Sequence, residues 1–254
     1  MIATMKTFRS VAVLLCAVAL SACEKNTVQD ITGPLPASRI KFFNFGVGAP
    51  GVNFYANDTK MTAISSTSGT ESILGVAYSA AGNGGLYSGI APGAYTFSGR
   101  IAAATDKDLA ITKTATTIED GKFYSYYVSG VYNAAAKSAD AFLVADPIPA
   151  ETDFSVAKVR FVNVVANSTA ALGVGDAAGT VTLIGGAVPY KSASAFVSVP
   201  PGVYGMAASF QGAGTATATN ISFLGGRIYT VGARGDVTAT TGATVPGFLV
   251  TANR

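Results

Sequence analysis

The chain of 254 residues has no histidine and no tryptophan, and it has only two cysteines. Without histidine, catalytic triads and zinc sites built on histidine are excluded, and so are histidine general bases. Charge is also scarce, because charged residues make up 12% of the chain while hydrophobic residues make up 49%. Disordered chains combine low hydrophobicity with high net charge, so we expect a folded protein.

The N-terminus has the order of a secretory signal: basic residues, a short apolar run, and small residues before a cysteine. These parts are Lys6 and Arg9, the run Val11–Leu20, and Leu20-Ser21-Ala22-Cys23. The apolar run is too short for a transmembrane helix, which needs about 20 residues. The Leu-Ser-Ala-Cys string resembles the lipobox of bacterial lipoproteins, whose cysteine is acylated, for example with palmitate. We predict a signal peptide at 1–22 and a lipid on Cys23; the alternative is an ordinary secretory signal with a chance cysteine.

Loss of this signal would leave 254 − 22 = 232 residues and lower the net charge from +3 to 15 − 14 = +1. A nearly neutral protein is a poor partner for nucleic acid. Cys16 would be lost with the signal, so Cys23 would be the only thiol and no internal disulfide could form. Once acylated, Cys23 cannot serve as a nucleophile.

After the cysteine, residues 23–37 are polar and contain Gly33, Pro34 and Pro36, which predicts a flexible tether. From Arg39 the chain breaks into short apolar stretches separated by Gly, Asn, Asp or Pro, a pattern typical of strands and turns. The strands expected in the first half are Arg39–Phe45, Val52–Tyr55, Ser72–Tyr78, Leu86–Ile90, Ala94–Ile101, Leu109–Ile118, Lys122–Val131 and Ala141–Val144.

The pattern then restarts, with four matches in the same order at offsets of 119, 109, 105 and 106 residues. The matched strings are Arg39-Ile40-Lys41-Phe42-Phe43-Asn44 with Lys158-Val159-Arg160-Phe161-Val162-Asn163, Pro92-Gly93-Ala94-Tyr95 with Pro201-Gly202-Val203-Tyr204, Gly121-Lys122-Phe123-Tyr124 with Gly226-Arg227-Ile228-Tyr229, and Ala141-Phe142-Leu143-Val144 with Gly247-Phe248-Leu249-Val250. Such order indicates an internal duplication. We predict an all-β protein of two tandem antiparallel β-sandwich domains, immunoglobulin-like or transthyretin-like, at 38–146 and 157–254, with a linker at 147–156.

The repeated positions favour structural roles. Alternating basic and apolar residues predict an opening strand with one face buried and the other wet. Pro-Gly predicts a tight turn, after which Tyr95 and Tyr204 should point inward with the hydroxyl near a backbone acceptor. Tyr124 and Tyr229 match each other and should lie in the two cores.

These strings resemble the bacterial domain-of-unknown-function family 4397. The similarity covers 38–145 well and 157–251 more loosely, because Thr169–Gly175 lacks the aromatic of the matching strand Val52-Asn53-Phe54-Tyr55. The resemblance implies a secreted or surface lipoprotein, often with tandem copies. It brings no catalytic residues to carry over.

Three strings carry weak chemical signals. Gly46–Gly51 has the letters of a dinucleotide fingerprint, but a strand follows where a helix is required, which favours a plain glycine-rich turn. Asp106-Lys107-Asp108 and Glu119-Asp120 are acidic pairs in expected turns, whereas calcium needs six to eight oxygen ligands. We therefore predict no metal site, no cofactor and no catalytic residues.

The aromatic residues distinguish the two copies. Tyr127 aligns with Gly232, so the copies differ on one face of this strand. We hypothesise that Tyr127, together with Tyr78, Tyr87 or Tyr132, covers a domain–domain contact or binds a glycan or peptide. The simpler interpretation is that Tyr127 packs within its own domain.

The expected function is a lipid-anchored, non-catalytic binding or adhesion module of the cell envelope. Its partners would be the membrane, through Cys23, and a glycan or an envelope protein. In a cell with two membranes, Glu24 in place of an aspartate after the cysteine favours the outer membrane. A purely structural envelope component and a carboxylate-based glycan hydrolase remain as alternatives.

Overall fold

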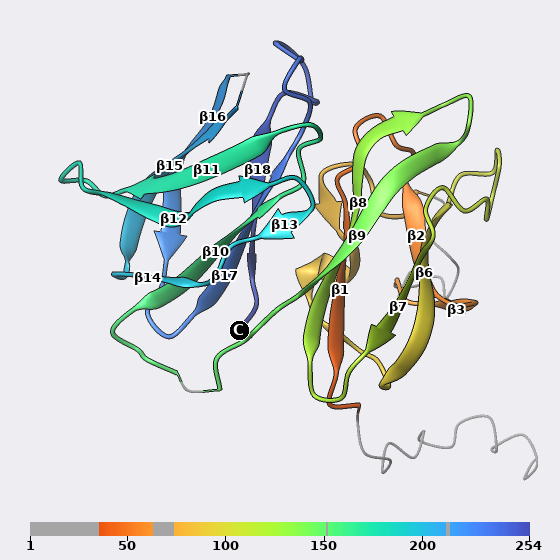
Figure 1. The fold of residues 1–254 in the computed structure, drawn as a ribbon, viewed down its shortest axis with the longest axis horizontal. Helices are drawn as coiled ribbons and strands as arrows, with labels where there is room; N and C mark the ends of the chain where they lie inside the picture. The colour runs from red at the N-terminus through yellow and green to blue at the C-terminus, as the bar shows by residue number, and fades with distance from the viewer. Residues whose placement is uncertain (1–35, 63–73, 151, 212–213) are drawn as a thin grey trace, which may run out of the picture. The chain divides into compact units, whose positions relative to one another are not determined.

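The computed structural model describes residues 36–62, 74–150, 152–211 and 214–254, and residues from Pro36 to Arg254 form one compact unit (Figure 1). The predicted signal peptide, Cys23 and most of the tether lie outside the described residues. Within them the chain forms strands and no α-helix, with one short 3-10 helix, η2 (Gly82–Gly85). No helix in this described part is long and apolar enough to cross a membrane.

The first sandwich consists of two sheets with the strand orders β4-β1-β8-β9, in which β5 also pairs with β1, and β3-β2-β6-β7. The bounds are β1 (Arg39–Asn44), β2 (Val52–Ala56), β3 (Thr59–Lys60), β4 (Ala80–Ala81), β5 (Ser88–Gly89), β6 (Gly93–Ile101), β7 (Thr114–Ile118), β8 (Phe123–Asn133) and β9 (Ser138–Ala145).

The second sandwich repeats this plan with the orders β13-β10-β17-β18, in which β14 also pairs with β10, and β12-β11-β15-β16. The bounds are β10 (Ala157–Asn163), β11 (Thr169–Gly175), β12 (Val181–Pro189), β13 (Ser192–Ala193), β14 (Val197–Val199), β15 (Gly202–Phe210), β16 (Thr215–Phe223), β17 (Ile228–Arg234) and β18 (Gly247–Ala252). The predicted pair of tandem β-sandwiches is confirmed.

One feature of the topology departs from the predicted antiparallel arrangement. The opening strand of each sandwich runs parallel to the strand before the last, so β1 pairs with β8 and β10 with β17. The other strand pairs are antiparallel. Parallel neighbours need a long crossover connection, and here the intervening strands of the same sandwich supply it.

Three expected strands are shorter than predicted. In Ser72–Tyr78 the described part forms only an isolated bridge from Val76 to Val52, and Gly75 adopts a positive φ of 58°. Leu86–Ile90 shortens to β5, and Leu109–Ile118 shortens to β7. The apolar residues that suggested strands here, Leu74, Leu86 and Leu109, are exposed. Other apolar residues of the same stretches, Val76, Ile90, Ile111 and Ile118, lie in the core, so these stretches contribute to the core without forming full-length strands.

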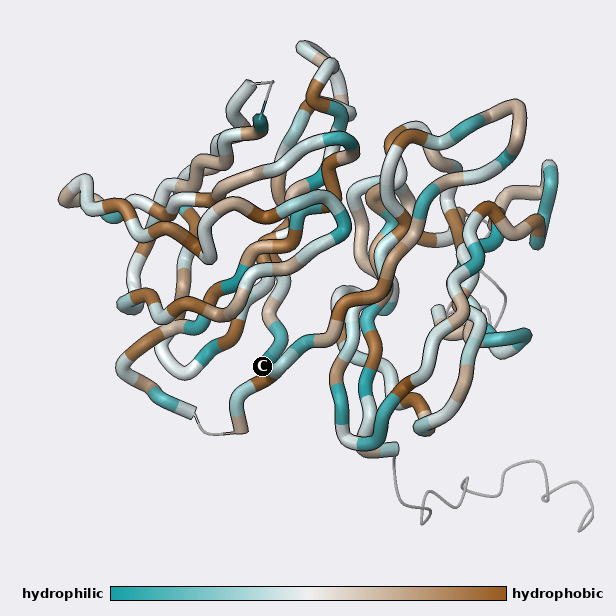
Figure 2. The backbone as a smooth tube through the Cα atoms, viewed as in Figure 1, coloured by the Kyte–Doolittle hydropathy of each residue, from teal (hydrophilic) through white to brown (hydrophobic). Residues whose placement is uncertain are grey.

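Each sandwich has its own core, and Figure 2 shows hydrophobic residues along the strands of both sandwiches. Phe42 and Phe54 stack in the first core with ring centroids 5.1 Å apart. The matched tyrosines behave alike, because the Tyr95 hydroxyl donates to Ala91 O at 3.1 Å and the Tyr204 hydroxyl to Pro200 O at 2.7 Å. The predicted backbone acceptor is therefore present in both copies.

Candidate functional site

The opening strands are buried on both faces, which corrects the predicted wet face. Lys41 is 1% exposed and Arg160 is 0% exposed. The reason is a third hydrophobic cluster, which joins residues of the β1 sheet to residues of the β10 sheet. The outward face of each opening strand meets the other sandwich instead of water.

Tyr127 lies in this cluster and is 1% exposed. Its ring stacks between Phe43, with centroids 4.6 Å apart, and Phe142, with centroids 5.2 Å apart. Val162 and Val164 of the second sandwich complete the cluster. Tyr127 thus belongs to the contact between the sandwiches, and a glycan or peptide has no access to its side chain here.

The two copies contribute unequal volumes to this contact. At matching strand positions, the first sandwich has Phe43 and Tyr127 where the second has Val162 and Gly232. The ring of Phe45 fills the space that Gly232 leaves, because a Cβ at Gly232 would lie 2.8 Å from Phe45 Cε2. Large rings on one side therefore meet small residues on the other, as close packing requires.

Two matched basic residues exchange hydrogen bonds across the contact. Lys41 Nζ donates to Ala252 O at 2.6 Å and to Asn253 Oδ1 at 3.1 Å, just past the end of β18. Its counterpart Arg160 donates to Ala145 O at 2.9 Å and forms an ion pair with Asp146, just past the end of β9. Such reciprocity is the mark of a two-fold interface between like surfaces, here within one chain.

Asp146 is the centre of this polar network and its side chain is fully buried. Its Oδ1 pairs with Arg160, and its Oδ2 accepts hydrogen bonds from Ser125 Oγ at 2.7 Å and from the Tyr87 hydroxyl at 2.6 Å. Burial, together with the adjacent Asp146 carboxylate, raises the pKa of Tyr87 far above its usual range. The Tyr87 ring lies 4.3 Å from Lys41 Nζ, so Tyr87 is part of the interface.

The other two predicted tyrosines, Tyr78 and Tyr132, lie in different places. The Tyr78 ring, from the first sandwich, lies 5.7 Å from the guanidinium of Arg234 in the second. Tyr132 packs against the core of the first sandwich instead. The structure therefore places Tyr78, Tyr87 and Tyr127 at the contact between sandwiches and leaves Tyr132 outside it.

Lys41 gives this contact a pH dependence. Burial lowers the pKa of Lys41 to about 8, although the nearby Asp146 opposes the shift. Between about pH 8 and pH 10 the folded chain therefore releases a proton that the unfolded chain still holds. Relative to Lys41→Met, the free energy of unfolding of the natural protein should therefore rise by about 1–3 kcal/mol over this window. Urea unfolding at both pH values should show the rise in the natural protein and its loss in Lys41→Met.

The matched control is Lys158→Met, because Lys158 bonds Ser198 Oγ at 2.7 Å on the exposed surface. This variant should keep the rise. From about pH 9 upward the tyrosines lower stability in every variant alike, because burial raises the pKa of Tyr126 and Tyr127 and the unfolded tyrosines ionise first. An equal rise in Lys41→Met and the natural protein would contradict the role of Lys41.

The weak chemical signals of the sequence lie in turns. Gly46–Gly51 connects β1 to β2 without a helix, and Gly48 has a φ of 73°. Asp106 forms an ion pair with Lys137, and Asp108 Oδ1 accepts from the Tyr55 hydroxyl at 3.4 Å. Within the described ranges, no group of three or more side chains gathers that could hold a metal ion.

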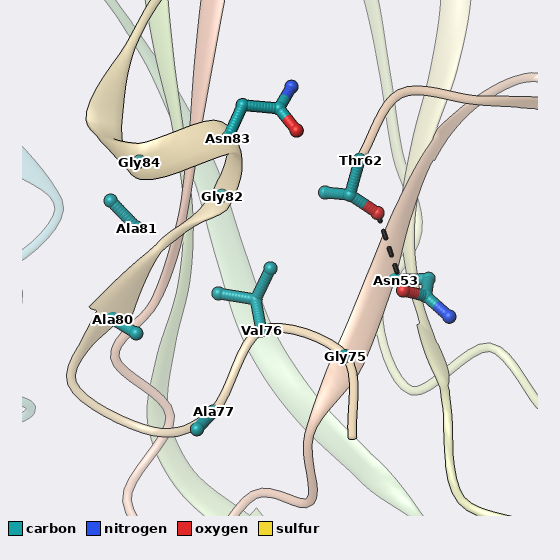
Figure 3. A pocket seen from close by; sticks show the side chains of 10 residues that line it. All are labelled: Asn53, Thr62, Gly75, Val76, Ala77, Ala80, Ala81, Gly82, Asn83 and Gly84. Carbon is teal, nitrogen blue, oxygen red and sulfur yellow. Dashed lines mark hydrogen bonds between the residues drawn. The ribbon is translucent and has the colours of Figure 1, made fainter. Parts of the chain in front are cut away.

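One hollow in the first sandwich, of about 480 Å³, is chemically plain (Figure 3). Glycines and alanines line most of it, and its polar groups include Thr62 Oγ1, which donates to Asn53 Oδ1 at 3.4 Å. None of its lining residues is titratable. Its polar lining among the described residues consists of amide and hydroxyl groups.

A second hollow, of about 330 Å³, is built by both sandwiches. Asn133, Ser138 and Asp140 line it from the β8–β9 hairpin, while Asn167 and Tyr190 line it from the second sandwich. Its lining is rich in hydrogen-bonding groups and contains one aromatic ring, a combination that suits a polar ligand.

Contacts within this second hollow fix its geometry. The Tyr190 hydroxyl donates to Asp140 Oδ2 at 3.0 Å and lies 3.0 Å from Ser129 Oγ. Lys191 Nζ forms an ion pair with the same carboxylate at 2.9 Å. Burial, opposed by the Ser129 hydrogen bond and aided by Asp140, raises the pKa of Tyr190. The Tyr190 hydroxyl therefore stays protonated. Its hydrogen bonds to Asp140 and Ser129 link the second sandwich to the first.

Several of these residues were not predicted. Lys41 and Arg160 were assigned to a wet strand face, Asp146 was only the last residue of the first predicted domain, and Tyr190 was not singled out. One signal could have found the first three: a basic residue recurs at the same place in both opening strands, and an acid or amide, Asp146 or Asn253, follows each closing strand. No known protein family matches the chain, and neither does any curated protein.

Proposed function

We propose that this chain is a lipid-anchored protein of the cell envelope that binds a polar, hydroxyl-rich component such as a glycan, without catalysis. The observation that supports it is the second hollow, in which polar side chains of both sandwiches converge. Because the interface fixes one sandwich on the other, these side chains form a preorganised set, which lowers the entropic cost of binding.

The anchor rests on the sequence. Leu20-Ser21-Ala22-Cys23 supplies the lipobox-like string, and the polar residues after it supply a tether. Glu24 in place of an aspartate after the cysteine supports the outer membrane, where a cell has one. The lipid on Cys23 then concentrates the binding hollow at the envelope.

A purely structural role is the second candidate, and one observation favours it. Tyr78, Tyr87 and Tyr127, which could have formed a binding surface, serve the contact between the sandwiches. A carboxylate-based hydrolase is less favoured, because it needs two acids about 5–10 Å apart in a cleft. Of the two hollows described above, the first is lined by no carboxylate and the second by Asp140 alone.

The test is retention of purified envelope polysaccharides by the immobilised protein. Asn167→Gly and Asp140→Asn should each weaken retention by about fivefold, the loss of one hydrogen bond of about 1 kcal/mol. Glycine suits residue 167 because Asn167 has a φ of 55°. Asn220→Gly is the matched control, since Asn220 is an exposed residue of β16 and has a φ of 59°.

Equal retention by all three variants would show that the polysaccharide binds somewhere other than this hollow. No retention of any polysaccharide by the natural protein would favour the structural role.

A further inference from the structure

Lys41 is buried without a counter-ion, although its matched residue Arg160 has one. Lys41 is 1% exposed, and among the described residues its Nζ forms no ion pair. Its hydrogen-bond acceptors are the uncharged Ala252 O at 2.6 Å and Asn253 Oδ1 at 3.1 Å. Arg160, by contrast, pairs with the carboxylate of Asp146. Because a buried ammonium group without a counter-ion is costly, burial favours any form of Lys41 that carries no charge.

The two pairs occupy equivalent positions in the two copies. Lys41 and Arg160 match in the opening strands β1 and β10. Asp146 and Asn253 are each the first residue after a closing strand, β9 and β18. In one copy a guanidinium, which stays protonated, meets a carboxylate, and the pair remains ionic. In the other copy a primary amine meets a carboxamide, and these two groups condense to a secondary amide when ammonia is lost.

The Asn253 side chain is held with its carbonyl toward Lys41. Asn253 Nδ2 donates to Thr230 Oγ1 at 2.7 Å, while Asn253 Oδ1 accepts from Lys41 Nζ. Thr230 Oγ1 is itself fixed, because it also accepts from Arg160 Nε at 2.9 Å. With a C=O bond of about 1.23 Å, Asn253 Cγ lies at most about 4.3 Å from Lys41 Nζ. A small rotation of the Asn253 side chain brings this distance to the roughly 3–3.5 Å of a near-attack geometry.

The surroundings favour Lys41 as a nucleophile. Burial lowers the pKa of Lys41 to about 8, so more of this side chain is a neutral amine than in a lysine in water at the same pH. The Tyr87 ring lies 4.3 Å from Nζ, and burial keeps out water, the competing nucleophile. The charge of the nearby Asp146 acts on Lys41, and this carboxylate is a base that can carry a proton.

We propose that Lys41 and Asn253 join in an intramolecular amide bond with release of ammonia. The lone pair of Lys41 Nζ attacks Asn253 Cγ, a new C–N bond forms, and the bond from Cγ to Nδ2 breaks. The proton that Nζ loses passes to Nδ2, which leaves as ammonia. The condensation changes no oxidation state, so it needs no oxidant or reductant. The bond ties together two positions 212 residues apart and makes the contact between the sandwiches covalent.

Tryptic peptide mapping of the full natural chain by mass spectrometry tests this proposal. Trypsin cleaves after lysine and arginine, and an amide at Lys41 blocks cleavage there. The bond should therefore join peptide 40–60 to peptide 235–254. The joined pair should be lighter than the sum of the two peptides by the mass of one ammonia. This result does not depend on the lipid anchor or on the polar hollow of the proposed function.

Three variants locate the bond. Lys41→Arg and Asn253→Ala should each abolish the joined peptide, because each removes one of the reacting groups. The matched control is Lys158→Met, since Lys158 bonds Ser198 Oγ at 2.7 Å on the exposed surface, and this variant should keep the joined peptide. The natural chain alone decides whether the bond exists, so a variant that fails to fold does not obscure the result.

Two outcomes in the natural chain would overturn the proposal. Cleavage after Lys41 with no joined peptide would leave Lys41 as a buried, hydrogen-bonded amine. Loss of ammonia from peptide 235–254 alone would assign the loss to a cyclic imide at Asn253. In a joined chain Lys41 has no amine, so the rise in stability between about pH 8 and pH 10 described above belongs to chains that are still unjoined.

Discussion

Asp146→Ala is expected to lower the free energy of unfolding by about 3–5 kcal/mol. The substitution leaves the guanidinium of Arg160 buried without its counter-ion, at a residue that is 0% exposed. It also removes the acceptor of the Ser125 and Tyr87 hydroxyls. Urea unfolding near pH 7, followed by circular dichroism, measures the change.

The control is Asp58→Ala. Asp58 pairs with Arg100 at 2.9 Å, but its side chain is 97% exposed, so its loss should cost less than about 1 kcal/mol. The double variant Asp146→Leu with Arg160→Met should recover much of the loss, because it removes both buried charges together. A loss in Asp146→Ala no larger than in Asp58→Ala would mean that Arg160 reaches water.

Tyr127→Ala is expected to cost about 3–5 kcal/mol, the usual range for deleting a buried aromatic ring. The ring stacks on Phe43 and Phe142, and its removal opens a void toward Val162. Hydrogen exchange should therefore rise in β1 and β8 and also in β10, which belongs to the other sandwich. Urea unfolding and amide exchange measure the two effects.

Two variants bracket this prediction. Tyr127→Phe keeps the stacked ring and should stay within about 1 kcal/mol of the natural protein. Tyr132→Ala removes a partly buried ring of the first core, outside the contact, and should leave exchange in β10 unchanged. If Tyr127→Ala raises exchange in the first sandwich alone, Tyr127 serves only its own domain.

The fold class and the duplication were predictable because they depend on local chemistry. Pro92-Gly93 and Pro201-Gly202 mark the same turn in both copies, and the tyrosine that follows each bonds a backbone carbonyl as expected. The direction of pairing was not predictable, since apolar alternation along β1 looks the same whether its neighbour runs parallel or antiparallel.

The contact between the sandwiches escaped prediction for a related reason. A strand that alternates basic and apolar residues suits a wet face, and Lys41 and Arg160 fit that pattern as well as surface residues do. What distinguishes them from surface residues is the hydrogen-bond acceptors across the contact. One of these, Asn253, lies 212 positions from Lys41 along the chain, so a local pattern cannot reveal it. The mismatch of Tyr127 with Gly232 was the visible sign that one face of this strand has a special role.

The reciprocal contact also sets an order of events during synthesis. The strands of the first sandwich are complete at Ala145, before β10 exists. Until the second sandwich forms, the first has an exposed apolar face made of Phe43, Phe45, Tyr127 and Phe142. Lys41 also lacks its acceptor Ala252 O, which lies 211 residues further along the chain. Contacts of such long sequence separation form late, and an open apolar face is prone to wrong partners. Until the second sandwich docks, this apolar face is therefore the part of the first sandwich most exposed to wrong contacts.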